Sequence, residues 1–404
     1  MTRVLRARWV LPMDRPPVDS GWIEIAEGRV VALGRGRPPA APEDLGTVAI
    51  LPGLVNAHTH LELSWMAGRV PPAGAMSDWI RTLLRVRRAG VPDGRAGEIR
   101  AAHEALAAMR ATGTVLVGDV SNTLVTPSLI RDAGLGGVVF HELLGFTAAE
   151  PARVVREAWA RVHALEASLP ADADGVPLAL SVVAHAPYSV SPELFRQIAH
   201  AKEDAPLAVH LGESPEEIEF LRTGRGPMRD ALESIGVSTE GWPVPACDPV
   251  RYMADLGYLQ PGMLAVHGVH LTDDALERLR QADAVLVTCP RSNVWVGAGP
   301  PRLSHFYASG VPVAVGTDSL ASVSTLSMFD ELAEMRRLAP DVAAAGLLES
   351  ATRIGARALG LEADYGTIGH GQRARFVVVD IPADEADVEE YLVSGVSADT
   401  VRVI

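Results

Sequence analysis

Two histidines, His58 and His60, stand two residues apart at the end of the apolar run 54–60. In an extended strand, residues two apart point to the same side, so the two imidazoles would lie next to each other. Neutral imidazole is a common ligand of Zn²⁺ and related ions. Chance spacing in a loop is the alternative, because an H-x-H pair alone is a weak motif. Whether this pair is part of a metal site or a chance pair in a loop therefore depends on the other residues of the chain.

Four later apolar runs of strand length also end in residues that can bind a metal or move a proton. These residues are His185, His210, His267 and Asp318. Three imidazoles and one carboxylate would make a mononuclear metal site with room for a bound water. The expected metal ligands are His58, His60, His210 and Asp318. Such a site lowers the pKa of its water towards ~7 and gives hydroxide at neutral pH.

Three residues are expected to do catalysis at this site. Glu213, three residues beyond a ligand, is placed to take the proton of the water and pass it to the substrate. His267 would stabilise the attacking hydroxide or the tetrahedral adduct, and Asp318 would orient the water as well as bind the metal. Lys202 is the single lysine and lies in a polar segment that predicts helix. A second metal, bridged by a carboxylated lysine, is therefore not expected.

The elements that must position these residues alternate between strand and helix. The apolar runs that predict strands are 54–60, 114–120, 137–142, 178–185, 207–211, 263–268, 284–289 and 311–318. Helical patterns follow most of them, at 77–89, 96–111, 151–168, 192–201, 273–281 and 325–338. Eight buried parallel strands alternating with helices indicate an α/β fold, a closed (β/α)₈ TIM barrel over residues 51–359. A doubly wound sheet would need a glycine fingerprint after its first strand, where His58 and His60 stand instead.

The two ends of the chain have a different character, with short β-like pieces between turns rich in proline and glycine. These pieces are 3–11, 21–25 and 29–33 near the N-terminus, and 373–380, 391–393 and 400–404 near the C-terminus. We expect residues 1–50 and 360–404 to form one small β-sandwich domain together. The long connection 212–261 is a candidate lid or specificity element, because it follows a strand at the end of the barrel where active sites lie.

Composition narrows the class of protein. The 404 residues are 48% hydrophobic and carry a net charge of −14, which argues against a nucleic-acid or anionic-membrane surface. Two cysteines, Cys247 and Cys289, cannot form a disulfide framework and fit a reducing compartment. The N-terminal segment lacks a long apolar run, so we expect no signal peptide, and no apolar run reaches the ~20 residues of a membrane span. We expect a cytoplasmic protein with a small-molecule substrate.

The motifs as a set resemble the amidohydrolase superfamily, in its mononuclear deaminase branch. The resemblance rests on the segment 52–60, on His210-x-x-Glu213, on His267-Gly-x-His270, on Ser292-Asn293 and on Gly316-Thr-Asp318. It implies the metal and proton-transfer roles given above. It extends into 369–380, which resembles the return of the family into its small β-domain, except that Arg375 replaces a more usual aspartate.

Within that family, segments 56–64 and 212–221 are most similar to the aminodeoxyfutalosine deaminases of menaquinone biosynthesis, which remove the 6-amino group of an adenine nucleoside carrying a benzoate. The resemblance implies attack of metal-bound hydroxide on the ring carbon that bears the amine. Glu62, Glu142 and His185 are the expected substrate contacts, His185 at the ribose. An arginine among 222, 225 and 229 could pair with the benzoate, or all three could be solvated.

Several alternatives stay open. Deamination of S-adenosylhomocysteine, methylthioadenosine or guanine, or hydrolysis of another ring C–N or C–Cl bond, would use the same site. A metal-free relative kept as an interaction scaffold is disfavoured, because such proteins typically lose ligands that are all present here. One Zn²⁺ per subunit is expected, with Fe²⁺ as the alternative, because three imidazoles and a carboxylate suit both ions. Barrels with this added β-domain are commonly dimers, so a homodimer is an option.

Overall fold

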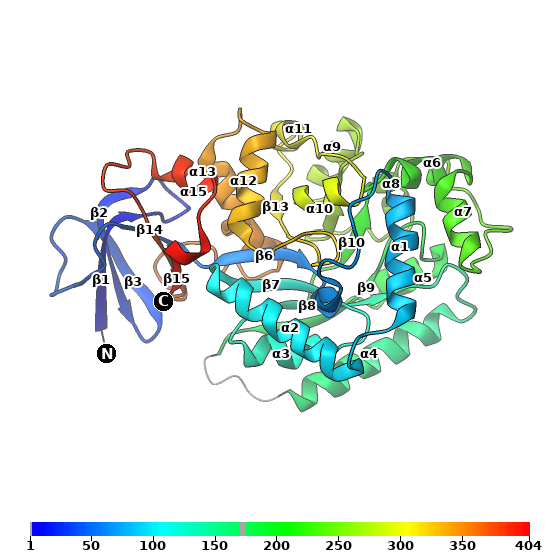
Figure 1. The fold of residues 1–404 in the computed structure, drawn as a ribbon, viewed down its shortest axis with the longest axis horizontal. Helices are drawn as coiled ribbons and strands as arrows, with labels where there is room; N and C mark the ends of the chain where they lie inside the picture. The colour runs from blue at the N-terminus through cyan, green and yellow to red at the C-terminus, as the bar shows by residue number, and fades with distance from the viewer. Residues whose placement is uncertain (1, 170–174) are drawn as a thin grey trace.

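The computed structural model describes residues 2–169 and 175–404 (Figure 1). Each of the eight apolar runs contains a strand, and within each sheet neighbouring strands are parallel. The strands are β6 (Leu54–Thr59), β7 (Thr114–Ser121), β8 (Gly136–Leu143), β9 (Leu178–Ala184), β10 (Ala208–Leu211), β11 (Leu264–His267), β12 (Val285–Thr288) and β13 (Val313–Val315). Almost all of their residues are buried, because parallel strands covered on both faces have no solvent side.

Hydrogen bonding divides these strands into two four-stranded sheets, β6-β7-β8-β9 and β10-β11-β12-β13, and not into the single closed barrel that the sequence predicts. At one junction a lone bridge joins Thr59 to Asp318. At the other, the backbone N–H of His210 donates to the carbonyl oxygen of His185 at 2.9 Å. The strands of the second sheet are only three or four residues long, so they offer few positions at which a ladder could continue. The number, order and direction of the strands were predicted correctly; closure by hydrogen bonds was not.

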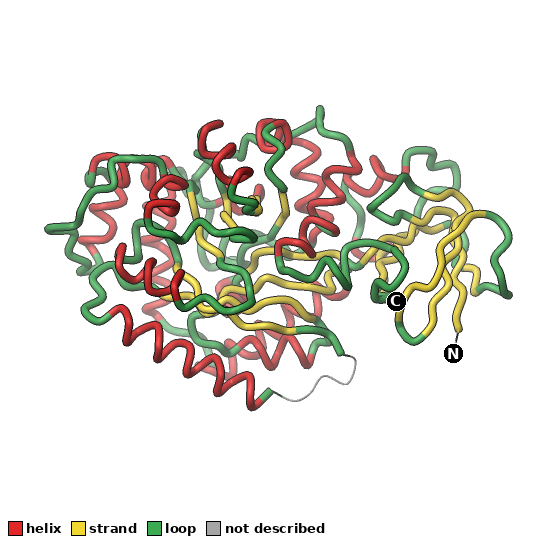
Figure 2. Tube along the Cα trace, turned by 180° about the vertical axis from the view of Figure 1, so that it is seen from behind, coloured by secondary structure: helices red, strands yellow, loops and turns green. Residues whose placement is uncertain are grey.

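Helices surround the strands, as Figures 1 and 2 show from opposite sides. They are α1 (Met76–Ala89), α2 (Gly94–Ala111), α3 (Thr126–Asp132), α4 (Pro151–Ser168), α5 (Pro192–His200), α6 (Pro215–Thr223), α7 (Pro227–Ser234), α8 (Pro249–Asp255), α9 (Asp273–Gln281), α10 (Pro290–Trp295), α11 (Leu303–Ala308), α12 (Met328–Leu338), α13 (Ala344–Ser350), α14 (Arg353–Ala358) and α15 (Val388–Val393), with 3₁₀ turns η1 (Leu61–Met66) and η2 (Ala398–Thr400). The local sequence determines where several of these helices begin. Ser191, Ser214 and Asp248 accept backbone N–H bonds as N-caps, each followed by a proline.

The two ends of the chain share one sheet, seen beside the two four-stranded sheets in Figure 1. Its strands are β1 (Thr2–Val10), β2 (Val18–Ala26), β3 (Arg29–Arg35), β4 (Glu43–Asp44), β5 (Val48–Pro52), β14 (Phe376–Asp380) and β15 (Val401–Val403). The antiparallel pair β5–β14 joins the ends, with Phe376 opposite Pro52. Leu5, Ile23 and Ile50 pack in a separate apolar cluster on this sheet.

Two expectations for these ends are wrong in detail. The described strands form one seven-stranded sheet, and a sandwich of two sheets is not seen among them. Residues 391–393, expected as strand, lie in α15, because the side chain of Asp387 caps its N-terminus and Val388 and Leu392 bury one helical face. The domain boundaries at residues 50 and 360 stay a prediction.

The connection 212–261 contains α6, α7 and α8. The rings of Phe220 and Trp242 stack within it, with centroids 4.5 Å apart and planes 2° from parallel. This contact packs α6 against the segment that follows α7. The action of the connection as a lid stays a prediction.

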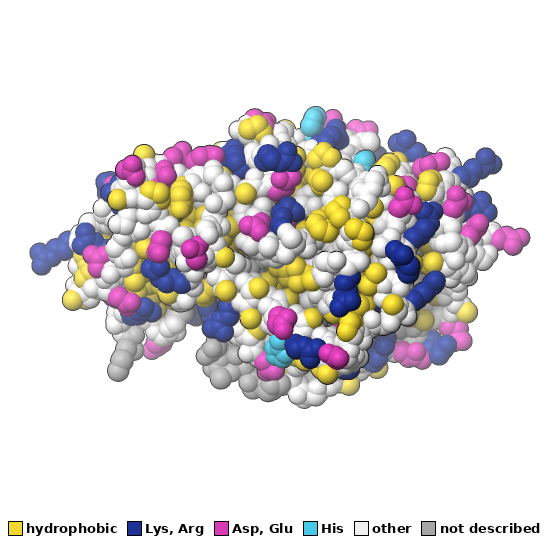
Figure 3. Space-filling model, viewed as in Figure 1, with side chains coloured by type: hydrophobic (Ala, Val, Ile, Leu, Met, Phe, Trp, Pro, Cys, Tyr) yellow, Lys and Arg dark blue, Asp and Glu magenta, His cyan; other side chains and the backbone are white. Residues whose placement is uncertain are grey.

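Charged side chains of both signs are interspersed over the face in Figure 3, and no extended basic patch covers that face. In residues 2–169 and 175–404, none of the helices combines the length and apolarity that crossing a bilayer requires.

Candidate active site

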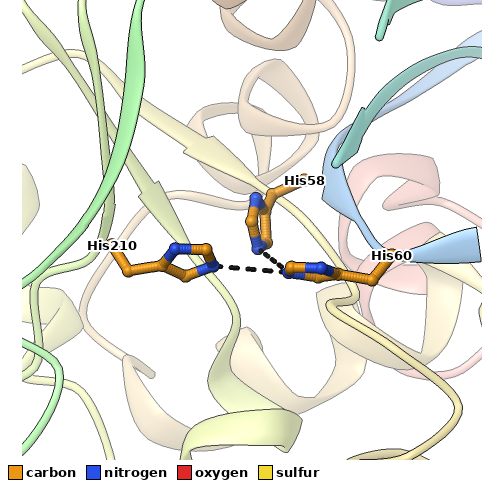
Figure 4. A group of neighbouring side chains, drawn as sticks. All are labelled: His58, His60 and His210. Carbon is orange, nitrogen blue, oxygen red and sulfur yellow. Dashed lines mark hydrogen bonds between the residues drawn. The ribbon is translucent and has the colours of Figure 1, made fainter. Parts of the chain in front are cut away.

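Three imidazoles converge at the carboxyl ends of β6 and β10 (Figure 4). The Nε2 atom of His60 lies 3.2 Å from Nε2 of His58 and 3.3 Å from Nε2 of His210. Four ligands around a tetrahedral Zn²⁺ with bonds of ~2.1 Å would be about 3.4 Å apart. The spacing of these three nitrogens therefore suits a single metal ion bound between them.

Asp318, which follows β13, brings a carboxylate oxygen to the same point. Its Oδ1 atom lies 3.6 Å from Nε2 of His60 and 4.0 Å from Nε2 of His58. The other oxygen, Oδ2, accepts hydrogen bonds from the hydroxyls of Ser292 at 2.6 Å and Ser322 at 3.0 Å. The two serines thus orient the carboxylate and leave Oδ1 facing the histidines, as outer partners of metal ligands do.

The histidines are held neutral, as metal ligands must be. Burial, the largest cause, lowers the pKa of His58 well below its ordinary value, that of His60 to about 3 and that of His210 to about 4. The Nδ1–H group of His210 donates to the backbone carbonyl oxygen of His185 at 2.9 Å, which leaves Nε2 with its lone pair towards the centre. Three neutral nitrogens and one carboxylate oxygen fit a divalent metal cofactor.

Glu213 and His267 face each other beside these ligands, with 3.6 Å between Glu213 Oε1 and His267 Nε2. Burial first, and then the charges of Asp318 and Glu217, raise the pKa of Glu213 well above its ordinary value. The side-chain amide of Asn293 donates to Nδ1 of His267 at 3.0 Å, which assigns the ring proton to Nε2. Glu213 is thus a buried carboxyl suited to carry a proton, and His267 presents an N–H group towards it.

Of the expected substrate contacts, Glu142 and His185 lie next to the candidate metal ligand His210. Together with His210 they form a second cluster of possible ligand atoms. Glu142 Oε1 lies 3.5 Å from Nδ1 of His210 and has no hydrogen-bond partner in the described part of the chain, whereas Oε2 accepts from Asn122. Nδ1 of His185 lies 2.6 Å from the hydroxyl of Ser189. Glu142 Oε1 is a buried acceptor that a substrate hydroxyl could satisfy.

Glu62 lies in a different environment. Its two carboxylate oxygens accept four hydrogen bonds of 2.9–3.1 Å, from the hydroxyls of Ser121 and Thr123 and from the backbone N–H groups of Asn122 and Thr123. The carboxylate holds the turn after β7, and its contact with substrate stays a prediction.

Three arginines on or beside α6 and α7 were considered for a substrate carboxylate. Arg222 and Arg225 are exposed, and Arg229 is half-buried. Arg229 Nε lies 2.8 Å from Glu233 Oε1, so this arginine already has an acidic partner. A role for any of them in binding substrate stays a prediction.

Several residues that shape the site had no individual role in the sequence-based prediction. Ser292 and Ser322 orient Asp318, Asn293 orients His267, and Glu217 binds the backbone around Glu213. The signals for two of them were visible: Ser292-Asn293 follows a strand, and Ser214-x-x-Glu217 has the spacing of a capping box. Ser322 has no comparable signal, because a serine in a loop is common.

The comparisons with known proteins agree with this geometry. A model of the amidohydrolase family matches residues 49–402. Aminodeoxyfutalosine deaminase of Deinococcus radiodurans is 35% identical over 350 residues, which are 83% of this chain and 79% of that protein. A 5-methylthioadenosine/S-adenosylhomocysteine deaminase of Nitratidesulfovibrio vulgaris is 29% identical over 400 residues, 94% of this chain and 84% of that protein. The structure of an adenosine deaminase from Xanthomonas campestris with bound zinc has the same fold, with a TM-score of 0.81, 24% identity, and coverage of 98% of this chain and 90% of that one.

Proposed function

This chain belongs to the amidohydrolase family, as its motifs predicted, and on that premise we propose that it deaminates an adenine nucleoside, with aminodeoxyfutalosine as the substrate. The reaction replaces the amino group on the ring carbon by oxygen from water and releases ammonia. The observation that carries the reaction class is the convergence of three neutral imidazoles and one carboxylate oxygen beside Glu213 and His267. The choice of nucleoside rests on the D. radiodurans relative.

In this proposal His58, His60, His210 and Asp318 hold one metal ion, Zn²⁺ or Fe²⁺. When bound, the ion supplies the Lewis acidity that makes water nucleophilic near neutral pH. Glu213 takes a proton from the attacking water and delivers it to the ring nitrogen next to the reacting carbon. The Nε2–H group of His267 donates to the attacking oxygen as charge develops on it. Asp318 Oδ1 orients the water, because the two serines fix the carboxylate.

Substrate recognition is proposed to use Glu142 and His185. Glu142 Oε1 is buried without a hydrogen-bond partner among the described residues, and an unpaired buried acceptor costs about 1–3 kcal/mol until a donor such as a ribose hydroxyl reaches it. The relative from N. vulgaris supports methylthioadenosine or S-adenosylhomocysteine as the second candidate substrate, since the same adenine chemistry would serve both.

The direct test is to follow ammonia release and the change in ultraviolet absorbance with aminodeoxyfutalosine, methylthioadenosine, S-adenosylhomocysteine, adenosine and guanine. We expect the highest kcat/KM with aminodeoxyfutalosine and about one equivalent of metal in the active protein. Activity on guanine alone would discard the nucleoside assignment, and full activity without metal would discard the reaction class.

Glu213→Gln tests the proton-transfer role. The variant should keep its metal and lose ~10²- to 10⁴-fold in kcat, because the amide cannot accept and release the proton. Glu219→Gln, an exposed position on α6, the helix that follows Glu213, is the control and should resemble the wild type. A Glu213→Gln variant with a near wild-type rate would refute the role.

A further inference from the structure

A second buried glutamate, Glu217, binds the backbone that leads to Glu213. Its Oε1 atom accepts the N–H of Gly212 at 2.9 Å, and its Oε2 atom accepts the N–H of Glu213, also at 2.9 Å. The side chain is completely buried in the first turn of α6. Both oxygens of one carboxylate are therefore used on two consecutive peptide groups.

This arrangement differs from ordinary helix capping. In a capping box, the glutamate at the third helical position binds the N–H of the N-cap residue, here Ser214. Ser214 does cap α6, since its Oγ accepts from the N–H of Glu217 at 3.2 Å. Glu217 interacts with the backbone of Ser214 as well, and in addition it binds the two preceding residues, which lie between the end of β10 and the helix. Its hydrogen bonds thus order the turn and not only the helix.

The turn itself is closely constrained. Gly212 has a φ of +63°, and a Cβ atom there would lie 2.5 Å from Cδ2 of Leu271, so the position requires glycine. The carbonyl oxygen of Gly212 accepts the N–H of His270 at 2.8 Å. The loop after β11 holds the turn from one side and Glu217 holds it from the other. Only two residues separate His210 from Glu213, so any shift of this turn would move Glu213 relative to the metal ligands.

We propose that Glu217 is a positioning residue, whose two hydrogen bonds to Gly212 and Glu213 fix the proton-transfer carboxyl relative to His210. The proposal rests on the proposed function for the role of Glu213. It adds a residue that touches neither metal nor substrate and yet sets the rate. Misplacement of a reacting group by about 1 Å can cost ~10²-fold in rate.

Glu217→Gln and Glu217→Ala are the test variants, with Glu219→Gln as the control on the same helix. Gln keeps one acceptor oxygen and turns an NH₂ group towards a backbone N–H, whereas Ala removes both acceptors. We expect kcat to fall ~10-fold for Gln and ~100-fold for Ala, with KM within about threefold of wild type and metal content unchanged. If the Ala variant does not fold, the Gln variant alone decides. A Glu217→Gln kcat within twofold of the control, at equal metal content, overturns the proposal.

Amide hydrogen exchange gives a readout that does not depend on turnover. The N–H groups of Gly212 and Glu213 should exchange about tenfold faster in Glu217→Gln than in Glu219→Gln, while the amides of β11 keep their protection. Unchanged exchange at residues 212 and 213 contradicts the proposal. If the wild type deaminates no adenine nucleoside, the proposed function fails, and the exchange data still decide whether Glu217 holds the turn.

Discussion

The Nδ1 atom of His210 lies 2.9 Å from the backbone carbonyl oxygen of His185. The end of β9 thereby orients a side chain that begins on β10, in the other four-stranded sheet. The backbone N–H of His210 donates to the same oxygen, also at 2.9 Å. No extended ladder of hydrogen bonds joins β9 to β10. The two hydrogen bonds at this junction are made by His210, the residue whose imidazole faces those of His58 and His60.

Replacing His210 by Ala should abolish metal binding. The variant loses one of three convergent nitrogens, so we expect less than ~0.2 equivalent of metal after dialysis and at least a ~100-fold loss of activity. Metal analysis and the deaminase assay measure both. His200→Ala, an exposed histidine on α5, is the control. Retention of a full equivalent of metal by His210→Ala would show that the ligand set is wrong.

Ser292→Ala should weaken the site without removing a ligand. The change deletes the 2.6 Å hydrogen bond to Asp318 Oδ2 and leaves only Ser322 to orient the carboxylate. We expect metal affinity or kcat to fall ~10- to 100-fold, as for other outer partners of metal ligands. Competition with a chelator measures the affinity, and Ser304→Ala on α11 serves as the control. Equal affinity and rate in the two variants would exclude the orienting role.

Glu142→Gln tests substrate recognition. The amide keeps an oxygen but offers one acceptor fewer to a substrate hydroxyl, so KM should rise ~10-fold while metal content stays at the wild-type level. His185→Ala should act in the same direction, although loss of its ring also removes packing against His210, whose ring centroid lies 4.8 Å away. Steady-state kinetics with the best nucleoside substrate measure both variants. A fall in kcat alone would place these residues outside the substrate contacts.

Asp119 makes stability depend on pH. Burial, the largest cause, raises the pKa of this carboxyl to about 8, above its unfolded value near ~3.9. The folded state therefore keeps a proton that the unfolded chain releases, so the contribution of Asp119 to stability is greatest below pH ~4 and declines as pH rises towards 8. Between about pH 5.5 and about pH 8 the wild type should lose up to ~3 kcal/mol at this group.

Asp119→Asn should remove most of that dependence. The amide can still accept from the N–H of Leu61 and can donate to the hydroxyl of Thr126, so it mimics the protonated acid. The melting temperature, measured at both pH values, should change less in Asp119→Asn than in the wild type. Asp204→Asn, at an exposed position, is the control and should follow the wild type. A variant that loses as much stability as the wild type would show that Asp119 is ionised in the folded state.

Sequence periodicity was sufficient to predict the strands. Continuous apolar runs such as 114–120 are typical of strands in a sheet covered on both faces. In the structure this run forms β7. Periodicity was insufficient for residues 391–393, where a capping aspartate and the helical spacing of buried residues outweighed the β propensity of Tyr391 and Val393. It was also insufficient for closure, because hydrogen bonding between β9 and β10 depends on how the two sheets meet.

The chemistry of the candidate site could be predicted from the types of residue that end the apolar runs. His58, His60, His210 and Asp318 end apolar runs, and the carboxyl ends of parallel strands lie at one edge, so their proximity follows from the fold. Glu62 shows the limit of that reasoning. It also follows a strand, but the four donors of residues 121–123 occupy its carboxylate, and these donors are 59 to 61 residues away in sequence.

The sequence by itself predicted the types of the candidate ligands, and it determined the order of the strands and the membership of a family of hydrolases. Only the tertiary structure decided which oxygen of Asp318 faces the metal position, which nitrogen of His267 carries the proton, and which glutamate near Glu213 holds its backbone. The physical reason is that the orientation of a polar side chain is determined by the hydrogen-bond donors and acceptors that packing places around it. The local periodicity of apolar residues predicts which residues are buried, but it does not predict which residue distant in sequence will be the hydrogen-bond partner.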